Sequence, residues 1–176
     1  MIQMRSAFAL SLFFTVACDP FGPGGPGDPG DPVTCATTGC SPGYRCVANQ
    51  CSVDPSGLWR LTVTRGMIAN KNASGISWDN FGGAPDPLVC LTISGSRVCT
   101  TTKQDTLTPV WNEASNPVTA SALLAGVTVE ILDEDLVGYE KMCQVGTIPF
   151  VEANFLTGVW GAGCPVASFD ATLTAQ

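Results

Sequence analysis

The chain has 176 residues, with 15 acidic and 8 basic side chains and no histidine. The net charge of −7 excludes the basic surface that nucleic-acid binding needs, so we expect no nucleic-acid partner. The lack of histidine removes histidine-based acid–base catalysis and histidine-ligated metal sites, and 19 glycines with 13 prolines argue against a helical bundle.

The first 17 residues combine one positive charge with a short apolar run. Arg5 precedes the 11-residue run Ala7–Ala17, which is too short to span a bilayer as a helix but has the length of a secretory signal. Small Ala17 directly before Cys18 resembles the lipobox of bacterial lipoproteins, in which the signal is cut before a cysteine that becomes lipid-modified. We therefore expect residues 1–17 to be a lipoprotein signal peptide and Cys18 to carry the lipid. Cleavage near Ala17 with free secretion is the alternative.

Residues 18–32 follow as a segment that alternates proline with glycine and has no apolar periodicity. Such a composition predicts a partly extended tether without a packed core, with a reach on the order of 40 Å at about 3.1 Å per residue. Together with Cys18, the tether predicts a lipid-anchored protein of the bacterial cell envelope, in the outer rather than the inner membrane.

Residues 33–53 form a second short unit with four cysteines. The unit is too short to bury a core, so we expect two disulfides to order it, with three pairings open. A zinc site is the competing interpretation, but an exported chain and the absence of paired two-residue spacings argue against it. The unit resembles short cysteine modules of bacterial surface lipoproteins, which implies a spacer or docking role. Its cysteines are Cys35, Cys40, Cys46 and Cys51.

Residues 54–176 show apolar and polar residues in alternation, with glycine, proline, serine and asparagine between the alternating runs. This pattern predicts strands with one buried face in an antiparallel sandwich or barrel. A segment of about 120 residues suffices for an independent core. The apolar positions of the clearest runs are Trp59, Leu61 and Val63; Val127, Val129 and Ile131; and Phe169, Ala171 and Leu173.

A tight hairpin is predicted where Ser94–Gly95 separates two short apolar runs. A two-residue turn there sets Cys90 opposite Cys99, and opposed residues of a non-hydrogen-bonded pair lie about 4.5 Å apart at Cα, which a disulfide can bridge. We therefore expect a Cys90–Cys99 disulfide, which leaves Cys143 and Cys164 as the second pair in this region.

Three short motifs within residues 54–176 occur in the order and at the separations found in one known family. They are Asp86-Pro87-Leu88-Val89, Thr108-Pro109-Val110-Trp111-Asn112-Glu113 and Asp133-Glu134-Asp135. They resemble the Asp-Pro-Tyr-Val, Asn-Pro-x-Trp-Asn-Glu and Asp-x-Asp motifs of the C2 domain, a calcium- and phospholipid-binding β-sandwich. The resemblance implies an all-β fold, an eight-stranded antiparallel sandwich whose loops at one end gather carboxylates around calcium ions.

The resemblance also implies which residues hold Ca²⁺. The first-loop spacing is one residue longer than in the family, which makes Asn80 an alternative to the neighbouring aspartate. A solvated strand end without a cation is the other interpretation of the third motif. The implied ligands are Asp79 and Asp86 from the first loop, Asp133 and Asp135 from the third, and Glu140 near the position of the last family aspartate.

The charge pattern supports a cation independently of the resemblance. Residues 130–140 contain five acidic side chains and no basic one. Carboxylates that lie so close to one another repel, unless water, distance or a cation reduces the repulsion. Calcium takes about 6–8 oxygen ligands, and five carboxylates offer at most about ten oxygens. Two ions would therefore need water or lipid phosphate to complete their coordination, and bound calcium would become a bridge to an anionic ligand.

Apolar residues lie between the acidic ones, where a solvated loop would not need them. Apolar tips beside a cation site suit insertion at a membrane interface, and packing against each other over the loop bases is the alternative. Arg97 and Lys103 are too few for a basic phosphoinositide patch. The predicted membrane-contact residues are Trp78, Phe81, Leu136, Val137 and Tyr139.

These observations favour a non-enzymatic, lipid-anchored envelope protein whose C2-like domain, residues 54–176, binds calcium and docks on a phospholipid membrane or an anionic surface. The alternative is a calcium-independent structural or interaction module with a protein partner on the bacterial cell surface. No spacing of carboxylates, serines or lysines in the chain proposes a catalytic site.

Overall fold

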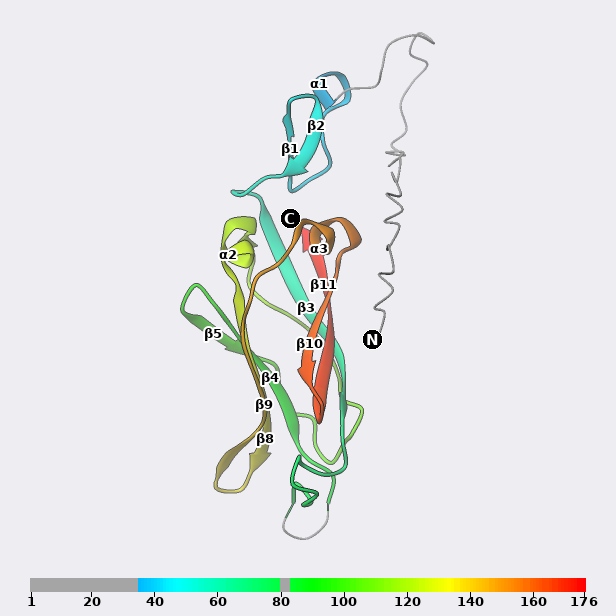
Figure 1. The fold of residues 1–176 in the computed structure, drawn as a ribbon, viewed down its shortest axis with the longest axis vertical. Helices are drawn as coiled ribbons and strands as arrows, with labels where there is room; N and C mark the ends of the chain where they lie inside the picture. The colour runs from blue at the N-terminus through cyan, green and yellow to red at the C-terminus, as the bar shows by residue number, and fades with distance from the viewer. Residues whose placement is uncertain (1–34, 80–82) are drawn as a thin grey trace, which may run out of the picture. The chain divides into compact units, whose positions relative to one another are not determined.

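The structure is a computed structural model that describes residues 35–79 and 83–176. The predicted signal peptide, the lipidated Cys18, the tether, Asn80 and Phe81 lie outside the described residues. The described strands from residue 58 onwards form two antiparallel sheets with a shared core between them (Figure 1).

The first sheet has the strand order β10–β11–β3–β6, and a further two-residue strand, β7, pairs with β3. The second sheet has the order β5–β4–β8–β9. This is the predicted antiparallel sandwich, with β7 added to its eight longer strands. The first sheet comprises β3 (Leu58–Ile68), β6 (Val110–Ala114), β7 (Val118–Thr119), β10 (Val159–Cys164) and β11 (Ala167–Ala175); the second comprises β4 (Pro87–Ile93), β5 (Ser96–Cys99), β8 (Val127–Asp135) and β9 (Gly138–Ile148).

The core consists largely of the alternating apolar residues that the sequence pattern identifies. On each of β3, β8 and β11 the apolar residues of the alternation are buried and most of the residues between them are partly or fully exposed, because successive side chains of a strand point to opposite faces. Each large aliphatic side chain buried in this way stabilises the fold by about 1.5–3 kcal/mol. The buried members of the three runs are Trp59, Leu61, Val63, Val127, Val129, Ile131, Phe169, Ala171 and Leu173.

The β4–β5 hairpin has the predicted register. Ile93 pairs with Ser96 and Cys90 with Cys99, across a turn in which Ser94 and Gly95 both have positive φ, 49° and 80°. Two central residues with positive φ define the turn whose twist matches that of the flanking strands. The structure contains the Cys90–Cys99 disulfide, with 4.0 Å between the two Cα atoms.

A second disulfide, Cys143–Cys164, joins β9 to β10. These two strands are the edge strands of different sheets, so the bond ties the two sheets together along one open side of the sandwich. A disulfide of this kind stabilises the folded protein chiefly by restricting the unfolded chain. For a loop of about this length, it raises the free energy of unfolding by about 3 kcal/mol.

Two short helices, α2 (Ala120–Ala125) and α3 (Glu152–Thr157), lie at one end of the sandwich, opposite the β8–β9 turn (Figure 1). Thr119 begins α2 as its N-cap, because its side chain accepts a hydrogen bond from the Ala122 N–H. In α3, Phe155 is buried and its ring packs edge-on against Trp59, with 5.0 Å between ring centroids. Of the helices in the described ranges, none has the length and apolar character needed to cross a membrane.

The cysteine-rich unit is a small hairpin held by two disulfides. Its two strands pair in register across a turn in which Ala48 and Asn49 have positive φ. Of the three pairings that the sequence leaves open, the structure contains Cys35–Cys46 and Cys40–Cys51. The elements of this unit are α1 (Cys35–Thr38), β1 (Tyr44–Val47) and β2 (Gln50–Val53).

The cysteine-rich unit contacts the sandwich at Trp59. The Tyr44 ring packs edge-on against the Trp59 ring, with 5.7 Å between centroids. Gly43 has φ +81°, and a Cβ atom there would lie 2.5 Å from the indole ring, so only glycine fits at this contact. The described residues of this unit and of the sandwich belong to one compact unit, Val33–Gln176.

Candidate functional site

An open cleft of about 820 Å³ lies at the end of the sandwich that carries the β8–β9 turn. Three segments meet there: the loop between β3 and β4, the connection between β5 and β6, and the β8–β9 turn. No basic side chain occurs in the described lining of the cleft. The lining residues are Asp79, Asp86, Gln104, Glu134, Asp135, Leu136, Val137, Gly138, Tyr139 and Glu140.

Asp133 occupies the buried floor of this end of the sandwich. It continues the inward-facing positions of Val129 and Ile131 on β8, so the strand that builds the core ends with a carboxylate on its core side. The residue has an exposed fraction of 0%. Its Oδ1 accepts a hydrogen bond of 2.6 Å from the backbone N–H of Asp86, whereas its Oδ2 is buried and has no hydrogen-bond partner among the described residues.

Three of the five predicted ligands come together as a close group. One carboxylate oxygen each from Asp79, Asp133 and Asp135 lies within 4.8 Å of the other two. Asp86 adjoins this group through its backbone bond to Asp133 and lines the cleft. Glu140 lines the same cleft and pairs with Asp133 across β8 and β9, but it is not one of the three.

Asp133 and Asp79 hold their protons more tightly than isolated carboxylates would. Burial raises the pKa of Asp133 to about 6, and the charges of Asp135 and Asp79 add to this effect against the opposing hydrogen bond from Asp86. Burial also raises the pKa of Asp79, followed by the charges of Asp86, Asp135 and Asp105. The group is therefore a concentration of negative charge, and no basic side chain of the described residues forms an ion pair with it.

Asp105 is a cleft-end carboxylate that the sequence analysis missed. It lies in the connection between β5 and β6, and its backbone N–H donates a hydrogen bond of 2.7 Å to Asp86 Oδ1. Asp105 lies outside all three motifs, and its only sequence signal is an acidic residue in a loop shortly before the Thr108–Glu113 motif. Gln104, its neighbour, lines the cleft.

The apolar tip of the cleft is the two-residue turn between β8 and β9. Leu136 and Val137 are fully exposed, with exposed fractions of 105% and 98%, and Tyr139 is exposed to 60%. The Tyr139 hydroxyl donates a hydrogen bond of 3.2 Å to a Glu134 carboxylate oxygen, which holds the ring beside the turn. These three predicted membrane-contact residues are therefore on the surface beside the acidic group.

The structure contradicts the prediction that Trp78 contacts a membrane. Its side chain is exposed to only 5% and belongs to the hydrophobic core. Its indole Nε1–H donates a hydrogen bond of 2.7 Å to the carbonyl of Ala69, because the loop after β3 folds back on the strand end. A core residue with its polar atom satisfied is not available to a membrane.

The Trp111-Asn112-Glu113 motif has a structural role. Trp111 is buried, as expected for a packing residue, and its Nε1–H donates to the Thr101 carbonyl at 3.0 Å. The Glu113 carboxylate accepts hydrogen bonds from the Thr101 backbone N–H at 2.7 Å and from Lys103 Nζ at 3.0 Å. The motif thereby holds the start of the β5–β6 connection against the sandwich.

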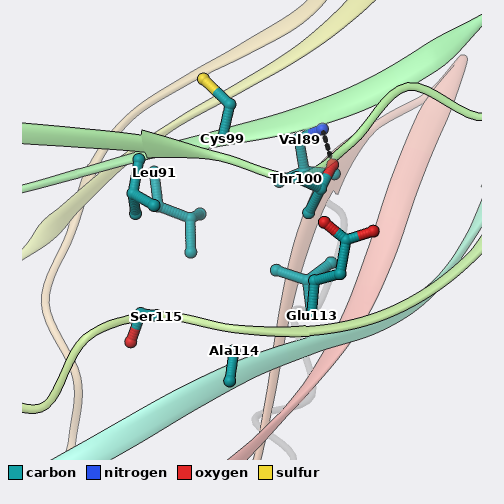
Figure 2. Close-up of a pocket in the computed structure, with 9 residues that line it drawn as sticks. Val89, Leu91, Cys99, Thr100, Glu113, Ala114 and Ser115 are labelled. Carbon is teal, nitrogen blue, oxygen red and sulfur yellow. Dashed lines mark hydrogen bonds between the residues drawn. The ribbon is translucent and has the colours of Figure 1, made fainter.

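A smaller cavity of about 60 Å³ lies between the sheets beside this motif (Figure 2). Figure 2 shows the Thr100 hydroxyl accepting a hydrogen bond of 3.0 Å from the Val89 backbone N–H at its edge. A cavity of this volume can hold only a few water molecules, so it is not a candidate ligand site. Its labelled lining residues are Val89, Leu91, Cys99, Thr100, Glu113, Ala114 and Ser115.

The basic side chains of the second sheet are paired with an acidic one. Arg97 and Lys141 both contact the Glu130 carboxylate, each at 3.1 Å. Lys103 is held by Glu113 at 3.0 Å. Cations that are neutralised in this way do not offer the free positive charge that phosphoinositide recognition needs.

The fold has counterparts among known proteins. The family model of the C2 domain matches residues 61–157, more than half of the chain, and the chain belongs to the C2 domain family. The sequence-based recognition of this family and of its fold class is thereby confirmed. A search of curated protein sequences finds no match.

Solved structures of C2 domains share the fold at low sequence identity. A C2 domain of plant extended synaptotagmin 1 is 20% identical, with 70% of this chain and 96% of that chain covered and a TM-score of 0.50. A structure of extended synaptotagmin 2 that contains its SMP domain and two C2 domains is 14% identical, with 69% and 27% covered and a TM-score of 0.52. A calcium-bound structure of two C2 domains of extended synaptotagmin 2 is 15% identical, with 69% and 46% covered and a TM-score of 0.50. The chain spans less than half of the length of the latter two.

Proposed function

We propose that this protein is a non-enzymatic, lipid-anchored protein of the bacterial envelope whose C2 domain binds calcium in the acidic cleft and docks on an anionic phospholipid membrane. Membership of a family of calcium- and phospholipid-binding modules supports the class of function. The predicted lipidation of Cys18 and the proline- and glycine-rich composition of residues 18–32 support the anchored location.

The observation that carries the proposal is the buried Asp133 Oδ2, which has no partner in the described structure and belongs to a group of three carboxylates. A buried oxygen without a hydrogen-bond donor costs about 1–3 kcal/mol or more when it is charged, and a cation removes that cost. Calcium prefers oxygen ligands, and the donor set here consists of carboxylate oxygens. The residues that would hold the ion are Asp79, Asp86, Asp133 and Asp135, with Glu140 at the edge of the cleft.

Membrane docking follows from the position of the apolar tip. Without a cation, the acidic group repels an anionic lipid surface, and the exposed Leu136 and Val137 cannot approach it. Bound calcium supplies positive charge that offsets the carboxylates and attracts lipid phosphate. The side chains of the turn then enter the interface, which removes their apolar surface from water.

The direct test is co-sedimentation of the full chain with vesicles of phosphatidylcholine and phosphatidylserine, with calcium or with a chelator. Only the difference between the two conditions is scored, so that any binding by the apolar run Ala7–Ala17 cancels. We expect calcium-dependent binding that Asp135→Asn removes. The control is Glu152→Gln, the same loss of one charge on α3 at the other end of the sandwich.

Binding that is equal with calcium and with chelator would contradict the proposal. If Asp135→Asn and Glu152→Gln reduce vesicle binding equally, the cleft is not the site that binds calcium for docking. A protein that binds neither calcium nor vesicles would favour the alternative function, a calcium-independent module with a protein partner.

A further inference from the structure

The connection between β5 and β6 is held against the first acidic loop close to the cleft. The backbone N–H of Asp105 donates to Asp86 Oδ1 at 2.7 Å, and the backbone N–H of Thr106 donates to the Pro85 carbonyl at 2.9 Å. These two hydrogen bonds come from adjacent residues, so they fix both the position and the direction of the backbone there. The Asp105 carboxylate is therefore presented from a defined backbone position.

The carboxylates of Asp105 and Asp79 both lie next to Gly83. A Cβ atom at Gly83 would lie 2.7 Å from Asp79 Oδ2 and 3.4 Å from Asp105 Oδ1. Both oxygens thus border the same space, which stays free because residue 83 has no side chain. The charge of Asp105 is also one of the causes that raise the pKa of Asp79, in agreement with their closeness.

The space beside Gly83 adjoins the close group of three carboxylates in which calcium binding is proposed. Asp79 is a member of the close group with Asp133 and Asp135, and the buried Oδ2 of Asp133 has no hydrogen-bond partner among the residues described. A cation bound by the Asp79 carboxylate would lie close to the space that Asp79 Oδ2 and Asp105 Oδ1 border.

We propose that Asp105 is a further ligand of the calcium site, so that the β5–β6 connection supplies a carboxylate beside those of the first loop and the β8–β9 turn. The inference rests on the calcium binding proposed above. Calcium binding would then tie three segments of the chain together.

Asparagine at residue 105 tests the carboxylate with little change to the backbone. The bond to Asp86 comes from the main chain, so the substitution leaves it in place. Asp105 has φ +48°, a left-handed conformation that asparagine also adopts readily. Asp105→Gly is a second variant, because glycine fits this φ at no steric cost and carries no oxygen ligand.

The experiment is calorimetric titration of the full chain with calcium chloride, for the wild type, Asp105→Asn, Asp105→Gly and the control Glu152→Gln. We expect both Asp105 variants to weaken calcium binding roughly tenfold, because a divalent ion loses one nearby carboxylate. Glu152→Gln, at the other end of the sandwich, should bind like the wild type.

The outcomes separate the inference from the function on which it rests. If the wild type binds calcium and Asp105→Asn and Asp105→Gly bind it equally well, the assignment of Asp105 is wrong while the proposed function stands. If the wild type gives no calcium heat, the proposed function fails and the inference fails with it. A variant that melts in chelator as the wild type does is folded, which makes its loss of affinity a property of the site.

Discussion

At the scale of single residues, Asp133 connects the core to the cleft. Strand β8 buries Val129 and Ile131, and the next residue on the same face is an aspartate with no exposed surface. The protein therefore places a carboxylate where its fold would favour an apolar side chain. Such a residue costs stability in the free protein and regains it when a cation binds.

The free protein should consequently become less stable as Asp133 ionises. The pKa of Asp133 is about 6 in the folded protein against an ordinary 3.8, because of burial and neighbouring carboxylates. Well below pH 4 this carboxyl is protonated in both the folded and the unfolded chain, and the residue does not change the free energy of unfolding with pH. Between pH 4 and 6 the unfolded chain loses a proton that the folded one keeps, so the free energy of unfolding falls as pH rises, by on the order of 3 kcal/mol in total.

The measurement is urea unfolding in chelator from pH 4 to pH 7, for the wild type and Asp133→Asn. Glu130 titrates in the opposite sense, because hydrogen bonds from Lys141 and Arg97 lower its pKa, and taking the difference between the two proteins removes its contribution. The wild type should lose stability relative to the variant as pH rises. A difference that is constant over this range would contradict the assignment.

Sequence reasoning found the members of the acidic group but not every residue around it. The spacing of Asp133 and Asp135 predicts that they share a face of a strand, and the two indeed belong to one close group. The burial of Trp78 was not predictable, because nothing in a loop sequence shows that the chain folds back to pair the indole with Ala69. Asp105 was missed because its contact with Asp86 depends on the path of a separate connection.

At the scale of elements, strand alternation and turn chemistry determine most of what the structure shows. The β4–β5 hairpin follows from Ser94–Gly95, since a two-residue turn fixes the register of every pair that follows. The β8–β9 turn is equally short, Leu136–Val137, and it places two fully exposed apolar residues at the tip. The order of strands in the two sheets depends on contacts distant in sequence and is not available from local patterns.

The β8–β9 turn should be needed for membrane docking and dispensable for calcium. The double variant Leu136→Ser with Val137→Ser changes two fully exposed side chains, so folding and the calcium heat should stay as in the wild type. Calcium-dependent vesicle binding should weaken at least about tenfold, since burying each side chain contributes about 1.5–3 kcal/mol when it is complete.

The matched control for the turn is Val151→Ser with Leu156→Ser. These side chains are exposed to 56% and 62% and lie at α3, at the end opposite the turn. The measurement is co-sedimentation over a series of lipid concentrations. Equal losses in the two double variants would show that general surface hydrophobicity, rather than the turn, determines docking.

At the scale of the whole molecule, the described chain divides its tasks between two ends. The cysteine-rich unit packs on Trp59, whereas the acidic cleft and its apolar tip lie at the end with the β8–β9 turn. Disulfides hold both the small unit and the sandwich. The sequence predicts that residues 35–51 are cross-linked but not which cysteines pair, because chain spacing alone allows three connectivities.

Calcium binding at Asp133 and Asp135 is the basis of the proposed function, and calorimetric titration of the full chain with calcium tests it most directly. Three proteins are compared: the wild type, the double variant Asp133→Asn with Asp135→Asn, and a control that loses two charges away from the cleft, Glu152→Gln with Asp170→Asn. We expect the wild type and the control to bind calcium with dissociation constants of about 10⁻⁴–10⁻³ M, as extracellular modules do, and the double variant to give no heat of binding. Equal heats for the wild type and the double variant, or no heat for the wild type, would contradict it.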